Sequence, residues 1–294
     1  MRVLLFGANG QVGHELRRAL APLGEVICAT RSGTLADGSA CQTADFDAPQ
    51  TLAPLVGALA PDVVVNAAAY TAVDRAESER EAAFRANALA PGELAAACAR
   101  AGALLVHYST DYVFDGRGSR PYREDDPTAP LGVYGASKLA GEQAVAGSGA
   151  RHLVLRTAWV YASHGHNFMR TMLRLARDRD ELRVVADQVG TPTPAALIAD
   201  VTAQVLARPF DGSGIRHLTA SGETSWHGFA SAIIARAVEL GLVERAPKVL
   251  PITTADYPTP APRPAYSRLD CSRLEREFAI ELPDWKQALE SVLV

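Results

Sequence analysis

The sequence of 294 residues lacks the features that mark membrane, secreted and nucleic-acid-binding proteins. No apolar run is long enough to cross a bilayer, and the apolar start, residues 1–7, is too short for a signal peptide. The 29 basic and 33 acidic residues are mixed along the chain, leave a net charge of -4 and form no basic cluster that could neutralise a phosphate backbone. We therefore expect no nucleic-acid partner and no membrane attachment.

Cysteine is scarce as well. The four cysteines, Cys28, Cys41, Cys98 and Cys271, form no C-x-x-C pair and have no His or Lys beside them that would favour a reactive thiolate. This usage is typical of reduced thiols that serve packing, so we expect a cytoplasmic protein.

Short apolar runs alternate with longer amphipathic stretches, which predicts an α/β fold. The predicted strands are residues 2–6, 25–29, 63–66, 104–108 and 153–156, and the predicted helices are residues 11–21, 50–60, 81–101 and 134–146. Fully apolar strands joined by crossover helices are typical of a doubly wound parallel sheet of the Rossmann type.

After about Thr157 the pattern loosens, which predicts a second, smaller region. Pro192, Pro194 and Pro209 interrupt it, and residues 257–264 carry four prolines that exclude a helix or a central strand. We interpret residues 1–160 as a dinucleotide-binding domain. Residues 161–294 are then mainly a loop-rich substrate-binding region, with some elements returning to the sheet.

A glycine-rich turn lies between the first predicted strand and helix. Gly7, Gly10 and Gly13 are spaced G-x-x-G-x-x-G, with Gln11 and Val12 before the last glycine. Glycines let backbone N–H groups approach a pyrophosphate, whose charge the helix N-terminus favours. The turn predicts dinucleotide binding; the alternative is an ordinary strand-to-helix turn.

The residues after the next strands indicate which dinucleotide binds. Arg31 stands where NAD-dependent enzymes usually place an acidic residue, and it suits a 2′-phosphate, although a solvated surface arginine is the alternative. We therefore expect NADPH and leave NADH open. We place Asp45 and Phe46 at the adenine, and we expect the small residues Ala67, Ala68 and Ala69 to let the backbone lie against the cofactor.

Tyr134 and Lys138 are spaced Y-x-x-x-K, which puts both side chains on one face of a helix. A free tyrosine has a pKa of about 10, and a neighbouring ammonium lowers it, which gives a usable general acid. The alternative is a surface pair on an amphipathic helix. Thr110 follows the strand at residues 104–108, where an open sheet places its ligands, and it can align a substrate carbonyl beside Tyr134.

Several stretches together resemble the extended short-chain dehydrogenase/reductases and, within them, the dTDP-4-dehydrorhamnose reductase family. The resemblance runs nearly end to end, and Tyr108-Ser109-Thr110-Asp111-Tyr112-Val113-Phe114-Asp115-Gly116 is its most specific part. Related sugar-nucleotide dehydratases have Glu after this Thr-Asp, whereas Tyr112 stands here. The other matching stretches are Gly7-Ala8-Asn9-Gly10-Gln11-Val12-Gly13, Asn66-Ala67-Ala68-Ala69-Tyr70-Thr71-Ala72-Val73-Asp74, Tyr134-Gly135-Ala136-Ser137-Lys138, Arg156-Thr157-Ala158-Trp159-Val160-Tyr161, and Arg263-Pro264 followed by Ser267-Arg268-Leu269.

The resemblance implies reduction of a dTDP-linked 4-keto-6-deoxy sugar to dTDP-L-rhamnose by hydride transfer to C4. It implies that Tyr134 donates the proton to O4, that Lys138 also binds the cofactor ribose, and that Tyr108 contacts the cofactor. Asp111 and Trp159 match positions that contact substrate. A homodimer is left open.

No metal site is predicted from spacing. His164-Gly165-His166 has no Cys or carboxylate nearby in the sequence and is interpreted as a polar loop. Some members of the family are described with Mg²⁺, to which Glu15 could contribute, although nothing in the local spacing requires it.

Two other functions stay open. One is a reductase or epimerase for another nucleotide-linked keto sugar, because base and diphosphate contacts are expected in residues 190–193 and around Arg263. The other is a non-catalytic regulatory subunit of the same fold that only binds the cofactor.

Overall fold

The computed structural model describes residues 1–208 and 212–293, so the predicted interruption at Pro209 lies outside the described residues. Its centre is a seven-stranded sheet of order β11-β6-β5-β4-β1-β2-β3, in which every neighbouring pair is parallel. The strands are β1 (Arg2–Phe6), β2 (Glu25–Thr30), β3 (Gln42–Thr43), β4 (Val63–Asn66), β5 (Leu104–Thr110), β6 (His152–Thr157) and β11 (Gly214–His217). The predicted doubly wound parallel sheet is therefore confirmed.

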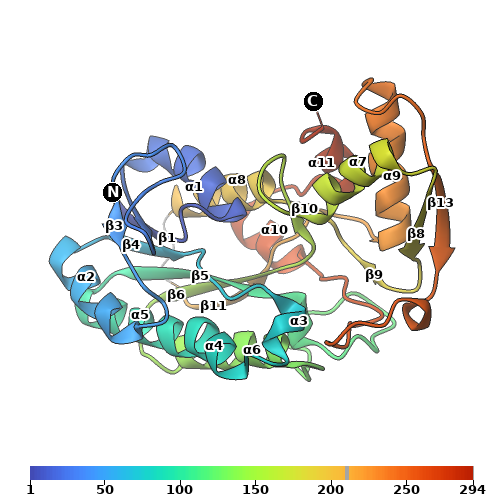
Figure 1. Ribbon diagram of the computed structural model, residues 1–294. Helices are drawn as coiled ribbons and strands as arrows, with labels where there is room; N and C mark the ends of the chain where they lie inside the picture. Colours follow the sequence, from blue (N-terminus) through green and yellow to red (C-terminus); the bar gives the residue numbers. More distant parts are fainter. Residues whose placement is uncertain (209–211, 294) are drawn as a thin grey trace.

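Helices cover both faces of this sheet (Figure 1). One face carries α1 (Gln11–Leu20), α8 (Ala195–Leu206) and α10 (Ser272–Phe278), and the other carries α2 (Leu52–Leu59), α5 (Ala90–Ala101) and α6 (Val133–Ala146). Two apolar cores result, one on each face, and they explain why β4, β5 and β6 are buried along their whole length.

The helix predicted at residues 81–101 is interrupted. It consists of α4 (Arg80–Phe84), a π-helical turn at Arg85–Leu89 and α5. Asn87 in this turn is buried and exchanges two hydrogen bonds with the backbone of Tyr70, at 2.8 and 3.0 Å, and donates a third to Ser137 Oγ at 3.0 Å. The π turn thus joins the loop after β4 to α6.

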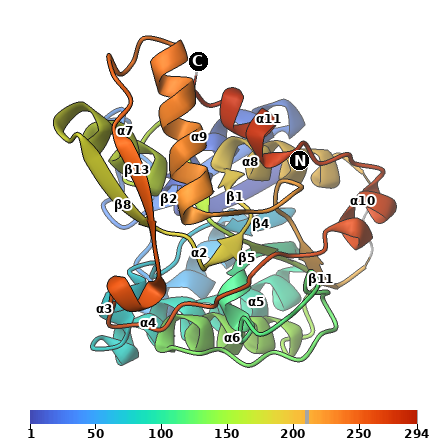
Figure 2. The same ribbon diagram turned by 90° about the vertical axis from the view of Figure 1, so that its right-hand side faces the viewer.

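A smaller layer packs beside the sheet and has a core of its own. It contains α7 (Phe168–Asp178), α9 (Trp226–Glu239), α11 (Trp285–Glu290) and the parallel pair β8 (Glu181–Val185) and β13 (Lys248–Ile252). In Figure 2, β13 and β8 lie on one side of α9 and α11 on the other. Two two-stranded pairs join β7 (Val160–Tyr161) to β10 (Thr193–Pro194) and β9 (Val189–Gly190) to β12 (Thr224–Ser225).

The loop-rich interpretation of the second region is wrong for much of its length. Pro194 directly precedes α8 as its N-cap residue, so it begins a helix and does not break one. The proline-rich residues 257–264 do run without helix or strand, as predicted. The remaining short elements are α3 (Val73–Ala76) and single turns of 3-10 helix at Ala21–Leu23, Pro49–Thr51, Asp111–Val113 and Thr254–Asp256.

Within residues 1–208 and 212–293, no helix is both long enough and apolar enough to span a bilayer.

Two glycines give opposite predictions for stability. A Cβ at Gly13 would lie 2.0 Å from Gly7 O, whereas a Cβ at Gly57, on the exposed side of α2, meets nothing within 4 Å. We expect Gly13→Ala to lower the free energy of unfolding by about 1–3 kcal/mol through overpacking. Gly57→Ala should raise it by about 0.5–1 kcal/mol, because alanine favours a helix. Denaturant titration of both variants measures the difference, and equal stabilities would contradict the predicted close packing of this turn.

Candidate active site

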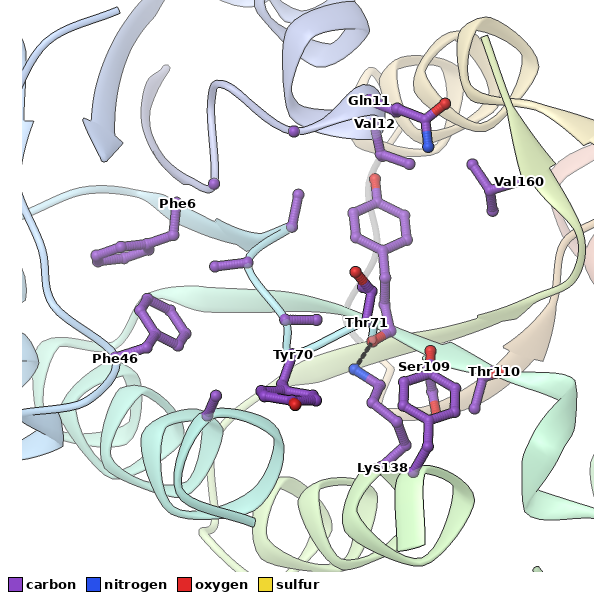
Figure 3. A pocket seen from close by; sticks show the side chains of 18 of the residues that line it. Phe6, Gln11, Val12, Phe46, Tyr70, Thr71, Ser109, Thr110, Lys138 and Val160 are labelled. Atoms are coloured by element: carbon purple, nitrogen blue, oxygen red, sulfur yellow. Dashed lines mark hydrogen bonds between the residues drawn. The ribbon is translucent and has the colours of Figure 1, made fainter. Parts of the chain in front are cut away.

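A cavity of ≈ 1170 Å³ opens where β1, β2, β4 and β5 end. The strand order reverses between β1 and β4, and ligands of open α/β sheets bind at such a reversal, beside the carboxyl ends of the strands. Side chains from the first turn, the strand ends and α6 converge on the cavity in Figure 3.

The glycine-rich turn forms one wall of this cavity. Gly7 has a positive φ of 77°, and a Cβ on it would lie 2.6 Å from Ala68 N, so only glycine fits here. Gly10, Gln11 and Val12 line the cavity, whereas Gly13 does not and instead packs against Gly7.

The start of α1 suits an anionic ligand. Gly10 offers no side-chain cap, and the first turn of α1 holds no acidic residue. The N–H groups of a first helical turn have no partner inside the helix, and the helix dipole favours negative charge there. These residues fit the pyrophosphate of a dinucleotide.

The adenine end of the cavity is partly as predicted. Phe46 lines it and is in edge contact with Phe6, with ring centroids 5.8 Å apart. Arg31 also lines it, but its guanidinium forms ion pairs with Asp45 at 3.5 Å and Asp47 at 3.0 Å. Of these two acids Asp47 lines the cavity, whereas Asp45 does not. A contact of Asp45 with adenine stays a prediction.

Small residues follow β4, as predicted. Ala67, Ala68 and Ala69 line the cavity, and the Ala68 N–H donates to Asn66 Oδ1 at 3.1 Å. Alanine side chains are small, so they leave room for a cofactor at this wall.

Thr110, Tyr134 and Lys138 all line the cavity, so the structure brings the predicted proton-delivery residues together. Lys138 is 3 % exposed, and its Nζ donates to Tyr108 O at 2.6 Å (Figure 3). Burial lowers the pKa of Lys138 to about 8, and Glu142, one helical turn away, opposes this shift. The phenol of Tyr108 is hydrogen-bonded to Thr202 of α8 at 2.7 Å.

The expectation that Lys138 lowers the pKa of Tyr134 is wrong for this structure. Burial raises the pKa of Tyr134 to about 12, with the Thr110 side chain acting against burial and the charge of Asp111 acting with it. The ammonium of Lys138 is engaged by a carbonyl oxygen instead. Tyr134 is therefore a neutral phenol at physiological pH, which is the form that a proton donor needs.

Three buried polar atoms beside these residues have no hydrogen-bond partner in the part of the chain that the structure describes. They are Ser109 Oγ, Asp111 Oδ2 and Thr157 Oγ1, all from residues that line the cavity. Burial raises the pKa of Asp111 to about 6, while the nearby hydroxyls of Ser267 and Thr110 act against this shift. Leaving such atoms unpaired is costly, so they are suited to a polar ligand.

Trp159 lines the cavity as expected, and the structure adds a residue that the sequence did not indicate. Trp226, the first residue of α9, also lines the cavity and stacks on Trp159. No local motif marks Trp226, because it joins the site only through folding. Arg263 is bound to Asp74 at 2.6 and 2.8 Å and is not a wall residue.

The loop at His164 has a carboxylate neighbour after all. Glu15 Oε1 lies 2.9 Å from His164 Nε2, and one ligand atom each from His14, Glu15 and His164 lie within 4.8 Å of one another. Glu15 lies 149 residues from His164 along the chain, so the sequence near His164 could not indicate this contact.

Known proteins match this chain over its whole length. The family described as the RmlD substrate binding domain matches residues 1–294. A dTDP-4-dehydrorhamnose reductase of Burkholderia thailandensis is 53% identical over 298 residues, covering 98% of this chain and 97% of the relative. The enzyme of the same name from Escherichia coli is 48% identical over 297 residues, covering 100% and 97%.

Solved structures agree with the sequence matches. The crystal structure of a Bacillus anthracis dTDP-4-dehydrorhamnose reductase in complex with NADP has a TM-score of 0.89, with 34% identity over 99% of this chain and 98% of that one. Its counterpart from Clostridium acetobutylicum has a TM-score of 0.90, with 37% identity over 100% and 98%. The chain therefore belongs to the RmlD substrate binding domain family, together with the dTDP-4-dehydrorhamnose reductases that it matches from end to end.

Proposed function

We propose that this protein reduces the 4-keto group of dTDP-4-dehydro-L-rhamnose with NAD(P)H and releases dTDP-L-rhamnose. The observation that carries the proposal is the placing of Thr110, Tyr134 and Lys138 in the same cavity as the glycine turn. Full-length relatives named dTDP-4-dehydrorhamnose reductase support the substrate, and the relative bound to NADP supports the cofactor. The four free cysteines are consistent with the cytoplasm as the site of this reaction.

Three side chains have separate roles in the proposed reaction. The nicotinamide supplies the hydride when the cofactor is bound. Tyr134 holds a proton at its phenol oxygen and donates it to O4 of the sugar, since an alkoxide is more basic than a phenolate even when the phenol pKa is about 12. Thr110 orients the carbonyl oxygen, and Lys138 offers its ammonium to ribose hydroxyls.

The alternatives are less well supported. A regulatory subunit that only binds cofactor has no use for a buried phenol that holds a proton beside Thr110. Asp111 is followed by Tyr112, not by the Glu of the dehydratases, which argues against dehydration. Mg²⁺ binding and a homodimer, neither of which was predicted, stay open.

The decisive experiment follows NADPH oxidation with the keto sugar made in place by the upstream dehydratase and epimerase. Oxidation only when both upstream enzymes are present would establish the reductase and the epimer it accepts. Absence of oxidation with NADPH and NADH, in protein that binds cofactor, would favour another keto sugar or the regulatory subunit.

Replacing the phenol separates chemistry from binding. We expect Tyr134→Phe to lower kcat by about 10²–10⁴-fold, the contribution typical of a general acid, with the Kd for NADPH unchanged. Tyr257→Phe is the matched control, because Tyr257 is 62% exposed and lies outside the cavity wall. Unchanged turnover in the Tyr134 variant would remove this residue from the mechanism.

Arg31→Ala tests the predicted preference for NADPH. A charge-assisted hydrogen bond contributes about 1.5–3 kcal/mol, so the Kd for NADPH should rise at least ten-fold while the Kd for NADH changes little. Arg18→Ala is the control, since Arg18 pairs with Asp200 away from the cavity. Calorimetry of both cofactors decides, and equal losses would exclude a 2′-phosphate contact.

A further inference from the structure

Two tryptophans from separate parts of the chain stack in the cavity wall. The rings of Trp159 and Trp226 are 3.5 Å apart between centroids and 4° from parallel. Trp159 follows β6, whereas Trp226 begins α9, and both side chains are half-buried, not enclosed in a core. Aromatic pairs prefer an offset or edge-to-face geometry, so a nearly eclipsed pair indicates that its surroundings hold it.

Neighbours other than Trp159 fix the side chain of Trp226. Its Nε1–H donates to Gln188 Oε1 at 3.2 Å, and Gln188 Nε2 in turn donates to Thr254 Oγ1 at 3.0 Å. Phe168 of α7 packs against the Trp226 ring with centroids 4.6 Å apart. The indole of Trp226 is therefore a fixed surface, anchored to the smaller layer.

Trp159 has an unusual backbone conformation. Its φ is +47°, and the other non-glycine residues with positive φ in the described chain, Ala60 and Ala279, are helix C-caps. Bulky residues rarely adopt this conformation, and it persists only where the surroundings over-determine it. Gly190 provides the room, because a Cβ there would lie 2.6 Å from Trp159 Cε2.

We propose that Trp226 is a positioning residue for the nucleotide sugar. It covers one face of the Trp159 indole and holds that ring as a preformed wall, whose opposite face packs against the hexose. This inference rests on the proposed function. When the Trp159 ring is immobilised before the sugar binds, binding loses less side-chain entropy. Trp226 therefore contributes to sugar affinity through Trp159.

The test measures binding by calorimetry with dTDP-L-rhamnose, dTDP and NADPH as separate probes. We expect Trp226→Leu to weaken dTDP-L-rhamnose roughly ten-fold and Trp226→Phe roughly three-fold, since a phenyl ring restores part of the stack. Binding of dTDP, which has no hexose, and of NADPH should stay within two-fold. Trp285→Phe is the control, because Trp285 is buried in the smaller layer and outside this cavity.

A spectroscopic signal reports on the stack independently of affinity. Stacked indoles give an exciton couplet in the far-ultraviolet circular dichroism, which should be present in the wild type and in Trp285→Phe and absent from both Trp226 variants. Turnover should show a raised KM for the keto sugar with kcat nearly unchanged.

Each other result contradicts a defined part of the proposal. Wild-type affinity for dTDP-L-rhamnose in Trp226→Leu overturns it, as does wild-type affinity in Trp226→Phe if the leucine variant does not fold. Equal losses for dTDP and dTDP-L-rhamnose would show that the pair faces the base and overturn the hexose contact. Equal losses for NADPH as well would reduce Trp226 to a structural residue. A wild type that binds neither dTDP nor dTDP-L-rhamnose contradicts the proposed function itself.

Discussion

The close approach of three backbone segments at Gly7 is the constraint on which the site depends. Gly7 leaves no room for a Cβ beside Ala67 and Ala68, and Gly13 leaves none beside Gly7. The end of β1, the start of α1 and the end of β4 thereby meet in one place, where the strand order of the sheet reverses. Because no side chain stands between them, backbone N–H groups and a helix N-terminus are left to face a ligand.

A buried ion pair holds the wall of the cavity that α6 forms. Lys138 and Glu142 lie one turn apart on α6, and Glu142 forms a two-pronged ion pair with Arg156 of β6 at 2.9 and 2.7 Å. Both members of this pair are at most 3 % exposed. Breaking a buried pair from one side leaves an unpaired charge and typically costs about 3–5 kcal/mol. The pair therefore locks the helix that carries Tyr134 and Lys138 against the strand beside Thr110.

Sequence patterns predicted the helices and strands that depend on residues close together in the sequence. The strand at residues 63–66 has the predicted bounds, and β5 extends two residues beyond its predicted end, to Thr110. The π turn at Arg85–Leu89 could not be predicted, because buried hydrogen bonds of Asn87 to a distant loop stabilise it. Trp226 and the Glu15–His164 contact were missed for the same reason: their partners are far away in the sequence.

The pKa of Tyr134 shows how burial can reverse an argument from spacing. A lysine four residues away on a helix is close enough to lower a phenol pKa. Here the ammonium of Lys138 binds the carbonyl oxygen of Tyr108, and it does not oppose the rise in the Tyr134 pKa that desolvation causes. A neutral phenol fits the proton-donor role proposed for Tyr134, because a donor must hold its proton until negative charge develops on the acceptor oxygen. The negative charge of Asp111 adds to the effect of burial, because it too disfavours the phenolate. Desolvation and Asp111 thus keep the Tyr134 phenol protonated and neutral, while the ammonium of Lys138 binds the carbonyl oxygen of Tyr108 in the same cavity.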